Sequence, residues 1–289
     1  MNIKLLTEIC VFTPLFGSII AGFFRKYIGR IGAHSVTILG LAISFIAAIW
    51  IGVELTNYNA NSVSFHLYTF VSGGNLFPYV LHIGFLIDPL TVLMLLVVTF
   101  ISLLVHVYSI GYMHDDDGYQ RFFSYISLFT FMMLMLVTSN NFLQLFFGWE
   151  GVGLVSYLLI GFWYNRESAN QGSLKAFLVN RFGDFGFILG IGLVLVNVGS
   201  LDYSALFASH LDIINQKVSL GFGYDVSLVT LICVLLFIGA MGKSAQVPLH
   251  VWLPESMEGP TPISALIHAA TMVTAGIFMV ARLSPLFEM

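Results

Sequence analysis

Charge is what this sequence has least of. Only 9% of its 289 residues are Asp, Glu, Lys or Arg, whereas 58% are hydrophobic. A soluble domain carries about 25% charged residues, so this chain has too few polar side chains to cover a surface exposed to water. The mean hydropathy is +0.91, and apolar runs long enough to cross a bilayer recur along the chain. The sequence therefore predicts an all-α polytopic membrane protein.

Several kinds of binding motif are also missing. The two cysteines, Cys10 and Cys233, lie far apart and cannot by themselves ligate an iron–sulfur cluster or a structural zinc ion. The basic residues are few and scattered, which argues against nucleic-acid binding. No glycine-rich nucleotide loop and no haem-attachment motif occurs. We therefore expect no cofactor and no metal in this chain.

The apolar runs define eight candidate membrane spans, one of them interrupted. Glu8 breaks the first run and no cleavage site follows, so we expect a retained helix rather than a signal peptide. The spans are Leu5–Phe24, Ser35–Val53, Pro89–Ile110, Phe122–Ser139, Phe142–Trp163, Leu174–Val198, Val226–Val247 and Thr261–Leu283.

The segments between the spans predict the topology. Most basic residues fall at one side of the spans, the side that the positive-inside rule makes cytoplasmic, so the N-terminus should lie outside. "SVSFHLYTF" and "YVLHIGFLID" flank Gly73–Gly74 and predict a short β-hairpin on the outer face. "DYSALFASHLDIINQ" is compatible with a short amphipathic helix. "TSNN" at 138–141 allows only a tight turn, so spans four and five should be antiparallel neighbours.

Glu150 is the clearest anomaly among the apolar runs. It lies about 12 Å along its predicted helix, near mid-bilayer, at 1.5 Å per residue. A carboxylate there costs several kcal/mol unless it is paired, hydrated or protonated. Gly148, Gly151 and Gly153 permit close helix approach, which favours a position facing other helices. Glu150 is either a protonated structural residue or part of a functional path.

Lys243 lies close to Pro248 at the end of the seventh span. It could snorkel to the membrane interface. However, Ser244–Pro254 carries no formal charge, and a proline cannot donate a backbone hydrogen bond, so the helix is expected to break. Broken helices in membranes often line polar cavities and ion sites. Near a movable carboxylate, the proton affinity of Lys243 would be switchable.

Four further positions complete the candidate set. Arg181 and Asp184 are three apart in the sixth span and can pair on one helix face, either as a local ion pair or as part of a path. His268, in "SALIHAATMVTAG", is either a hydrogen-bonded core residue or a proton carrier. His250 follows Pro248 and could face the cytoplasmic side. No catalytic triad or metal-ligand spacing accompanies them, so these residues favour a proton or cation path.

The longest motifs resemble a known family. "LVTSNNFLQLFFGWEGVGLVSYLLIGFW", "NRFGDFGF", "GKSAQVPLHVWLPESMEGPTPISALIHAATMVTAGIF" and "FLIDPLT" are similar to the N-terminal portion of the largest antiporter-like subunit of respiratory complex I. The resemblance implies that Glu150 pairs with Lys243, that Arg181 and Asp184 belong to the relay, and that His268 connects the lysine outward. It also implies that residues 1–110 form the first three helices with the hairpin, and that residues 111–289 form a proton-translocating half-channel of helices four to eight.

The same resemblance implies the setting. The chain would be a membrane-arm subunit of a proton-pumping NADH:quinone oxidoreductase, an enzyme subunit with no redox site of its own. NADH, FMN, iron–sulfur clusters and quinone would bind in partner subunits. Its partners would be the other membrane-arm subunits, the lipid bilayer and protons, with no nucleic acid. We expect a multi-pass protein of the bacterial inner membrane rather than of the mitochondrial inner membrane.

One departure from the family is large. Family members continue through a second, inverted repeat with its own broken helix and lysine, whereas this chain stops at Met289. A fragmentary gene, a split subunit and a truncated chain are all compatible with that. Two alternatives to the complex I assignment also stay open. These are the large subunit of a multisubunit cation/proton antiporter, from which the residues after "WE" differ, and a non-conducting scaffold.

Overall fold

The structure is a computed structural model that describes residues 2–57, 62–73, 79–209, 213–214, 216–219 and 225–289. Its long helices are α1 Ile3–Phe23, α2 Arg25–Asn57, α3 Pro89–Tyr112, α4 Tyr119–Val137, α5 Phe142–Ile160, α6 Glu167–Val198, α9 Leu228–Lys243 and α11 Met272–Arg282. Shorter helices are α7 Tyr203–Ala208, α10 Thr261–Ala265 and α12 Ser284–Phe287. The strands are β1 Val63–Val71, β2 Leu81–Ile87, β3 Lys217–Ser219 and β4 Asp225–Ser227.

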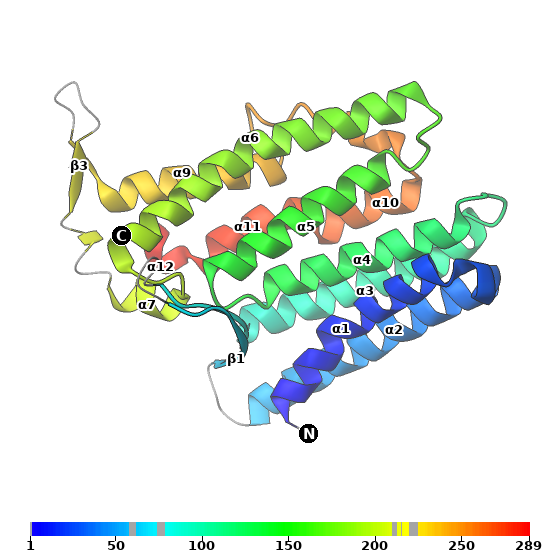
Figure 1. Cartoon of the computed structure of the whole chain (residues 1–289), viewed down its shortest axis with the longest axis horizontal. Coiled ribbons are helices and arrows are strands. Elements are labelled where there is room, and N and C mark those ends of the chain that lie inside the picture. The colour runs from blue at the N-terminus through cyan, green and yellow to red at the C-terminus, as the bar shows by residue number, and fades with distance from the viewer. Residues whose placement is uncertain (1, 58–61, 74–78, 210–212, 215, 220–224) are drawn as a thin grey trace.

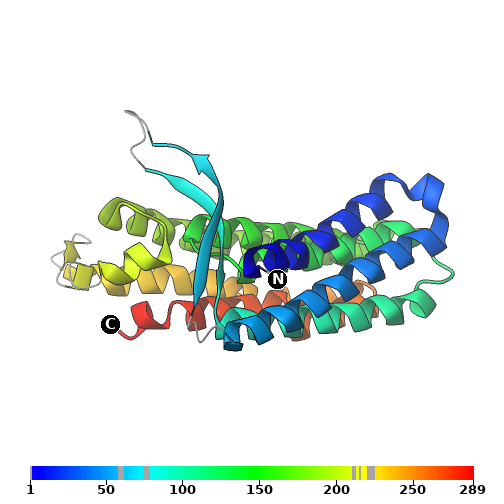
Figure 2. The same ribbon diagram turned by 90° about the horizontal axis from the view of Figure 1, so that it is seen from below.

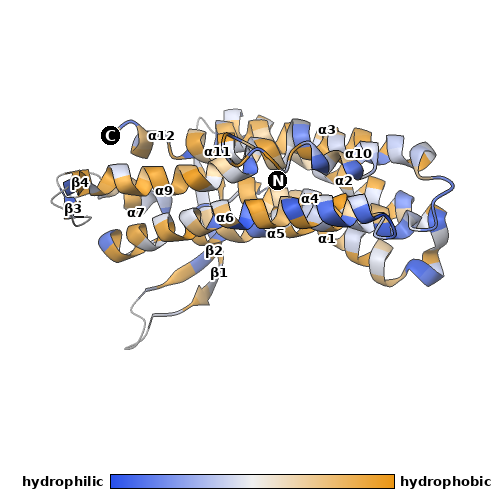
Figure 3. Ribbon diagram, turned by 90° about the horizontal axis from the view of Figure 1, so that it is seen from above, coloured by the Kyte–Doolittle hydropathy of each residue, from blue (hydrophilic) through white to orange (hydrophobic). Residues whose placement is uncertain are grey.

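The helices confirm the predicted multi-pass membrane fold. Seven helical segments of the described chain are long and apolar enough to cross a membrane, and the 16-residue α9 is the shorter eighth. Many large apolar side chains face outward, as lipid-facing residues do; Phe16, Phe182 and Val196 are examples. Hydrophobic residues dominate along the helices in Figure 3. The eight predicted spans therefore each correspond to a helical segment.

The helices run alongside one another with their turns at two opposite ends (Figure 1). The turns that join α1 to α2, α3 to α4 and α5 to α6 lie at one end. The strand β1, α7 and the C-terminus lie at the other. α4 packs against both α1 and α5, and α6 packs against α9. The turn between α4 and α5 spans only Thr138–Asn141, which confirms that these two helices are antiparallel neighbours.

The predicted hairpin is present, and it projects from the helices as a two-stranded arm (Figure 2). β1 pairs antiparallel with β2, with Phe65 opposite Phe85. Its base is tied to the turn after α4, because Leu86 N donates to Thr138 O at 2.8 Å and Gly84 N donates to Gln144 Oε1 at 2.9 Å. Gly73 follows β1, whereas Gly74 lies outside the described residues.

The segment after α6 matches the sequence in part. Gly199 ends α6 with a φ of 77°, a left-handed conformation that glycine adopts without a Cβ clash. The predicted amphipathic helix is present as α7, which is only six residues long. Residues 210–212 and 215 of that prediction lie outside the described residues.

Two spans are interrupted rather than one. α9 ends at Lys243, and turns lead from Ser244 to a 3₁₀ helix at Glu255–Glu258, which confirms the discontinuous seventh span. The eighth span is also irregular, because a π-helical segment, Leu266–Ala270, separates α10 from α11. Nothing in the sequence analysis anticipated this second interruption. π-helical segments within helices frequently mark functional sites.

Candidate functional site

The candidate site forms where α5, α6 and α9 meet. Helices α6 and α9 approach closely because glycines face each other. A Cβ on Gly183 would lie 3.2 Å from the Cα of Gly242. This contact brings Asp184, one residue after Gly183, next to Lys243, one residue after Gly242. The small residues therefore place two charged side chains side by side within the helix bundle.

Four charged side chains form one network there. Arg181 on α6 contacts both Glu150 on α5 and Asp184, the latter with Nη1 3.6 Å from Oδ2. Lys243 Nζ lies 3.9 Å from Asp184 Oδ2. The order is therefore Glu150–Arg181–Asp184–Lys243, with alternating charges. If all four ionise, the formal charge is zero, which limits the cost of placing them in a membrane.

This order confirms one predicted pair and differs from another. Arg181 and Asp184 do pair across one helical turn, as their spacing predicted. The resemblance implied that Glu150 pairs with Lys243. Within the part of the chain that the structure describes, Glu150 pairs instead with Arg181, and Lys243 with Asp184. Arg181 and Asp184 lie between the two expected partners in the series of ion pairs.

Lys243 is fully buried, which excludes the snorkelling alternative for this conformation. Its ammonium lies 5.8 Å from the centre of the Trp149 ring, a cation–π distance. It has no protein hydrogen-bond partner among the described residues, and neither does Asp184 Oδ2 or Glu150 Oε1. A buried ammonium with so few contacts is costly in its charged form. Such a group is suited to releasing and regaining a proton.

Trp149 and Gly153 shape the site; the sequence analysis assigned Trp149 no role, and gave Gly153 only that of permitting close helix approach. Trp149 Nε1 donates to Asp184 Oδ1 at 2.6 Å, and the indole stacks on Phe187 with ring centres 4.7 Å apart. A Cβ on Gly153 would lie 2.5 Å from Lys243 Nζ. Trp149 thus fixes one oxygen of Asp184, and Gly153 leaves the space that the ammonium fills.

His268 lies in the π-helical segment, behind the break in the seventh span. Trp252 bridges the two regions, because its Nε1 donates to Gly242 O at 2.9 Å and its ring centre is 6.3 Å from that of His268. The Ser256 hydroxyl donates to Leu253 O, so it can accept from His268 Nε2 at 3.1 Å. That assigns the proton to Nε2 and leaves the buried Nδ1, which has no hydrogen-bond partner among the described residues, able to accept one.

The remaining candidate, His250, stands apart from the network. It is exposed on the segment that follows α9, and its backbone carbonyl accepts a hydrogen bond from Leu253 N. A position at the surface is compatible with exchange between solvent and the site. Within the described residues, no three His, Cys, Asp or Glu side chains gather as metal ligands would.

Two further buried polar sites escaped the sequence analysis. Asp88, the N-cap of α3, forms an ion pair with Arg282 at the end of α11, and Arg282 Nη2 also donates to Thr91 Oγ1 at 2.6 Å. His106 on α3 is fully buried, with Nδ1 2.8 Å from Ser102 O. The motif Asp88-Pro89 at a predicted helix start is the signal that could have indicated the first.

Comparisons with known proteins identify the family and the fold. Residues 139–289 match the family described as "NADH:quinone oxidoreductase/Mrp antiporter, TM", and residues 75–123 match the "NADH-Ubiquinone oxidoreductase (complex I), chain 5 N-terminus". The chain is 59% identical to NADH-quinone oxidoreductase subunit L of Neisseria meningitidis serogroup A, covering 100% of this chain and 43% of that protein. It is 51% identical to NADH-ubiquinone oxidoreductase chain 5 of Triticum aestivum, covering 96% and 41%.

Two solved structures have the same fold. The Mrp complex from Dietzia sp. DQ12-45-1b matches with a TM-score of 0.77 and 25% identity, over 98% of this chain and 28% of that one. The membrane-bound sulfane sulfur reductase, an archaeal respiratory membrane complex, matches with a TM-score of 0.78 and 18% identity, over 96% and 40%. The chain spans less than half the length of the curated relatives given above.

Proposed function

This chain belongs to the NADH:quinone oxidoreductase/Mrp antiporter transmembrane family, and from that premise we propose that it translocates protons as part of a membrane-arm subunit of NADH:quinone oxidoreductase. The observation that carries the proposal is the ion-paired series Glu150–Arg181–Asp184–Lys243, in which Asp184 and Lys243 are buried. Relatives at 50–59% identity with redox-complex names support the oxidoreductase over an antiporter.

The geometry suggests how the residues could act. When Asp184 pairs with Arg181, it stabilises the Lys243 ammonium less, so the lysine can release its proton. When Asp184 faces Lys243 instead, the ammonium is stabilised and the proton is retained. Arg181 stays charged throughout because its guanidinium does not deprotonate in proteins. The movement of one arginine between Glu150 and Asp184 would therefore control the proton affinity of Lys243.

His268 would connect this switch to another exit. Nδ1 can accept a proton while Nε2 donates its hydrogen bond to the Ser256 hydroxyl. Trp252 connects the histidine to the end of α9, because its indole N–H donates to Gly242 O. We propose that NADH, flavin, iron–sulfur clusters and quinone bind in partner subunits, whose redox chemistry drives the movement. The proposed location is the bacterial inner membrane.

The test uses the chain in its native membrane complex. NADH is added to sealed vesicles, and quinone reduction and internal acidification are followed together. With Glu150→Ala we expect electron transfer with reduced acidification, and the same for Lys243→Ala. Glu167→Ala is the matched control, because that carboxylate is exposed and contacts only Gln171 among the described side chains.

Two outcomes would contradict the proposal. Normal acidification per electron in both variants would remove the proton-translocating role and favour the non-conducting scaffold. Proton movement that is driven by a sodium gradient, and that NADH does not drive, would favour the cation/proton antiporter, the alternative that the Mrp likeness supports.

A further inference from the structure

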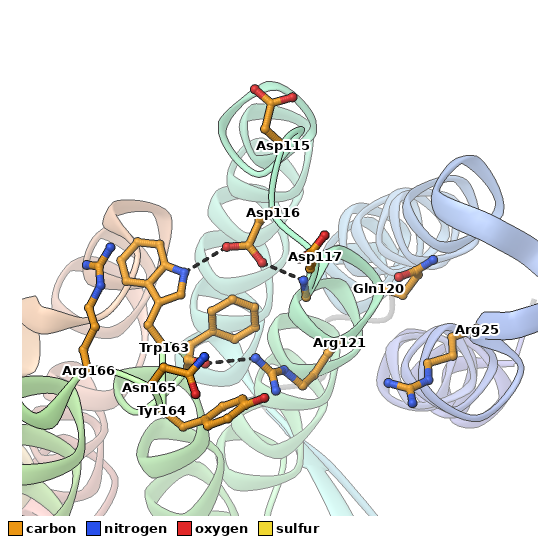
Figure 4. A pocket seen from close by; sticks show the side chains of 12 residues that line it. Arg25, Asp115, Asp116, Asp117, Gln120, Arg121, Trp163, Tyr164, Asn165 and Arg166 are labelled. Atoms are coloured by element: carbon orange, nitrogen blue, oxygen red, sulfur yellow. Dashed lines mark hydrogen bonds between the residues drawn. The ribbon is translucent and has the colours of Figure 1, made fainter.

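A polar cavity of about 590 Å³ lies at the end of the molecule opposite the hairpin. The α1–α2, α3–α4 and α5–α6 turns meet there (Figure 1). Arg25, Arg121 and Arg166 line it together with Asp115, Asp116 and Asp117. Figure 4 shows Arg25 and Arg166 on opposite sides of the cavity with Arg121 between them. The cavity is remote from the proton network, so its role does not depend on the proposed function.

The three arginines are not neutralised by the three aspartates. Within the described residues, none of these guanidinium groups forms an ion pair with a carboxylate. Arg121 donates to Phe162 O at 2.9 Å and lies 4.5 Å from the centre of the Phe162 ring, and its Nε is buried without a partner. Arg166 lies over the Trp163 ring at 4.2 Å. Aromatic contacts leave guanidinium N–H groups available to an anion.

The carboxylates occupy one edge of the same cavity. Asp116 is fixed in place, because it accepts from Trp163 Nε1 at 2.9 Å and from Gly118 N at 2.6 Å (Figure 4). Asp115 and Asp117 on either side of it are exposed. A simple anion would be attracted by the arginines and repelled by these carboxylates. A ligand with an anionic and a cationic group would satisfy both sets.

A second cavity beside the first indicates where the rest of the ligand would extend. It has a volume of about 190 Å³ and shares Arg121, Phe162 and Tyr164 with the first. It also reaches Tyr125 on α4 and Tyr157 on α5, and Asn170 and Ser173 of α6 line it as well. Tyr125 lies six residues past the start of α4, which is about 9 Å along the helix axis. The polar cavity is therefore continuous with a crevice that enters the membrane-spanning layer.

We propose that this pair of cavities binds one phospholipid whose headgroup carries both a phosphodiester and a free ammonium, as phosphatidylethanolamine does. The phosphodiester lies against Arg121 and Arg25, the ammonium against Asp117, and the glycerol region follows the crevice between α4 and α5. The lipid would then contact the α1–α2, α3–α4 and α5–α6 turns together, although these turns are far apart in the sequence. The crevice favours a lipid over free phosphate, which has no group to place in it.

The test uses the protein purified with its partner chains in detergent, stripped of lipid and reloaded. Phosphatidylethanolamine, phosphatidylcholine, phosphatidylglycerol and inorganic phosphate are the probes, and native mass spectrometry measures what stays bound. We expect phosphatidylethanolamine to bind about tenfold more tightly than the other two lipids, the scale of one charge-assisted contact. Asp117→Asn should abolish its preference over phosphatidylcholine, whose ammonium is blocked by methyl groups.

Two neighbouring residues provide the matched control. Arg25 lines the cavity, whereas Lys26 carries the same charge and does not. Arg25→Gln should weaken phosphatidylethanolamine binding about tenfold, and Lys26→Gln should leave it within a factor of about two. Equal binding by both variants, equal affinity for all three lipids, or displacement of the lipid by inorganic phosphate would each overturn the proposal.

Discussion

Gly153 decides where the ammonium of Lys243 can lie. The two residues are on different helices, and the lysine occupies the volume that a side chain at position 153 would take. A buried ammonium with no protein hydrogen bond is held by sterics and by charge rather than by directed contacts. Small changes in the space around it should therefore affect proton transfer more than folding.

Gly153→Ala tests this directly. The added Cβ would meet Lys243 Nζ at 2.5 Å, so the flexible end of the lysine must move away from Asp184. We expect proton translocation to fall by between tenfold and about 100-fold, the scale of an ångström-sized misplacement. Thermal unfolding in detergent should change little. Gly192→Ala on α6 is the control, because nothing lies within 4 Å of its Cβ position; equal losses in both variants would contradict this account.

Trp149→Phe separates hydrogen bonding from packing. Phenylalanine retains an aromatic ring against Phe187 but cannot donate to Asp184 Oδ1. Loss of one hydrogen bond to a charged group, about 1.5 kcal/mol, corresponds to a roughly tenfold decrease in proton translocation. Acidification of sealed vesicles measures it. Wild-type rates would show that the indole N–H does not position Asp184.

The candidate residues were predictable from the sequence because a charge in an apolar run is conspicuous. Glu150, Arg181, Asp184 and Lys243 all stand out in that way, and the structure brings them together. The pairing of Arg181 with Asp184 followed from their spacing, whereas the pairs between helices did not, because they depend on helix rotation and on the close approach at Gly183. Trp149 could not be distinguished from an ordinary buried aromatic residue.

At the scale of elements, two helix interruptions lie against each other. Ser244, just after the end of α9, donates from Oγ to Val273 O at 2.7 Å, at the start of α11. Thr271 Oγ1 donates to Leu266 O at 2.5 Å across the π-helical segment. Side-chain hydroxyls thus donate to backbone carbonyls at both interruptions. Proline and lysine indicated the first interruption, whereas the π-helical segment has no proline and gave no such signal.

Ser244→Ala should weaken the contact between the two interrupted spans. Removing this hydrogen bond costs about 1 kcal/mol. We expect a lower thermal unfolding midpoint in detergent, together with slower proton transfer between Lys243 and His268. Ser168→Ala serves as the comparison, since its hydroxyl is exposed and bonds only Glu258. If the two serine variants unfold alike, the contact does not stabilise the interruption.

At the scale of the whole molecule, Asp88 and Arg282 join the beginning of α3 to the end of α11, 194 residues apart. Arg282 is only 7% exposed. Burial by itself would raise the pKa of Asp88, but the hydrogen bonds and charge of Arg282, with hydrogen bonds from Thr91, hold the pKa below its usual value. Long-range pairs of this kind cannot be read from a single sequence, because neither residue indicates its partner.

The Asp88–Arg282 ion pair predicts that the folded protein is less stable at acid pH. Because the folded state lowers the pKa of Asp88, the carboxylate stabilises the protein above the usual aspartate value of 3.8, and the stabilisation is lost as pH falls through the lowered pKa. Asp88→Asn should cost about 3–5 kcal/mol at neutral pH, because it leaves Arg282 buried without its counter-charge. It should also flatten the dependence of thermal unfolding on pH below about 4.

The companion variant is the double substitution Asp88→Leu with Arg282→Met. Replacing both partners removes the uncompensated charge, so stability at neutral pH should recover most of what Asp88→Asn loses. If the double variant unfolds as readily as Asp88→Asn, the pair does not act through its charges.

The central claim is that Lys243 carries translocated protons, and the number of protons moved per electron tests it most directly. Sealed vesicles with the intact complex are compared for wild type, Lys243→Ala and Lys26→Ala, whose lysine lies in the turn region and outside the network. We predict continued electron transfer with fewer protons per electron in Lys243→Ala alone. An unchanged ratio in that variant would contradict the account.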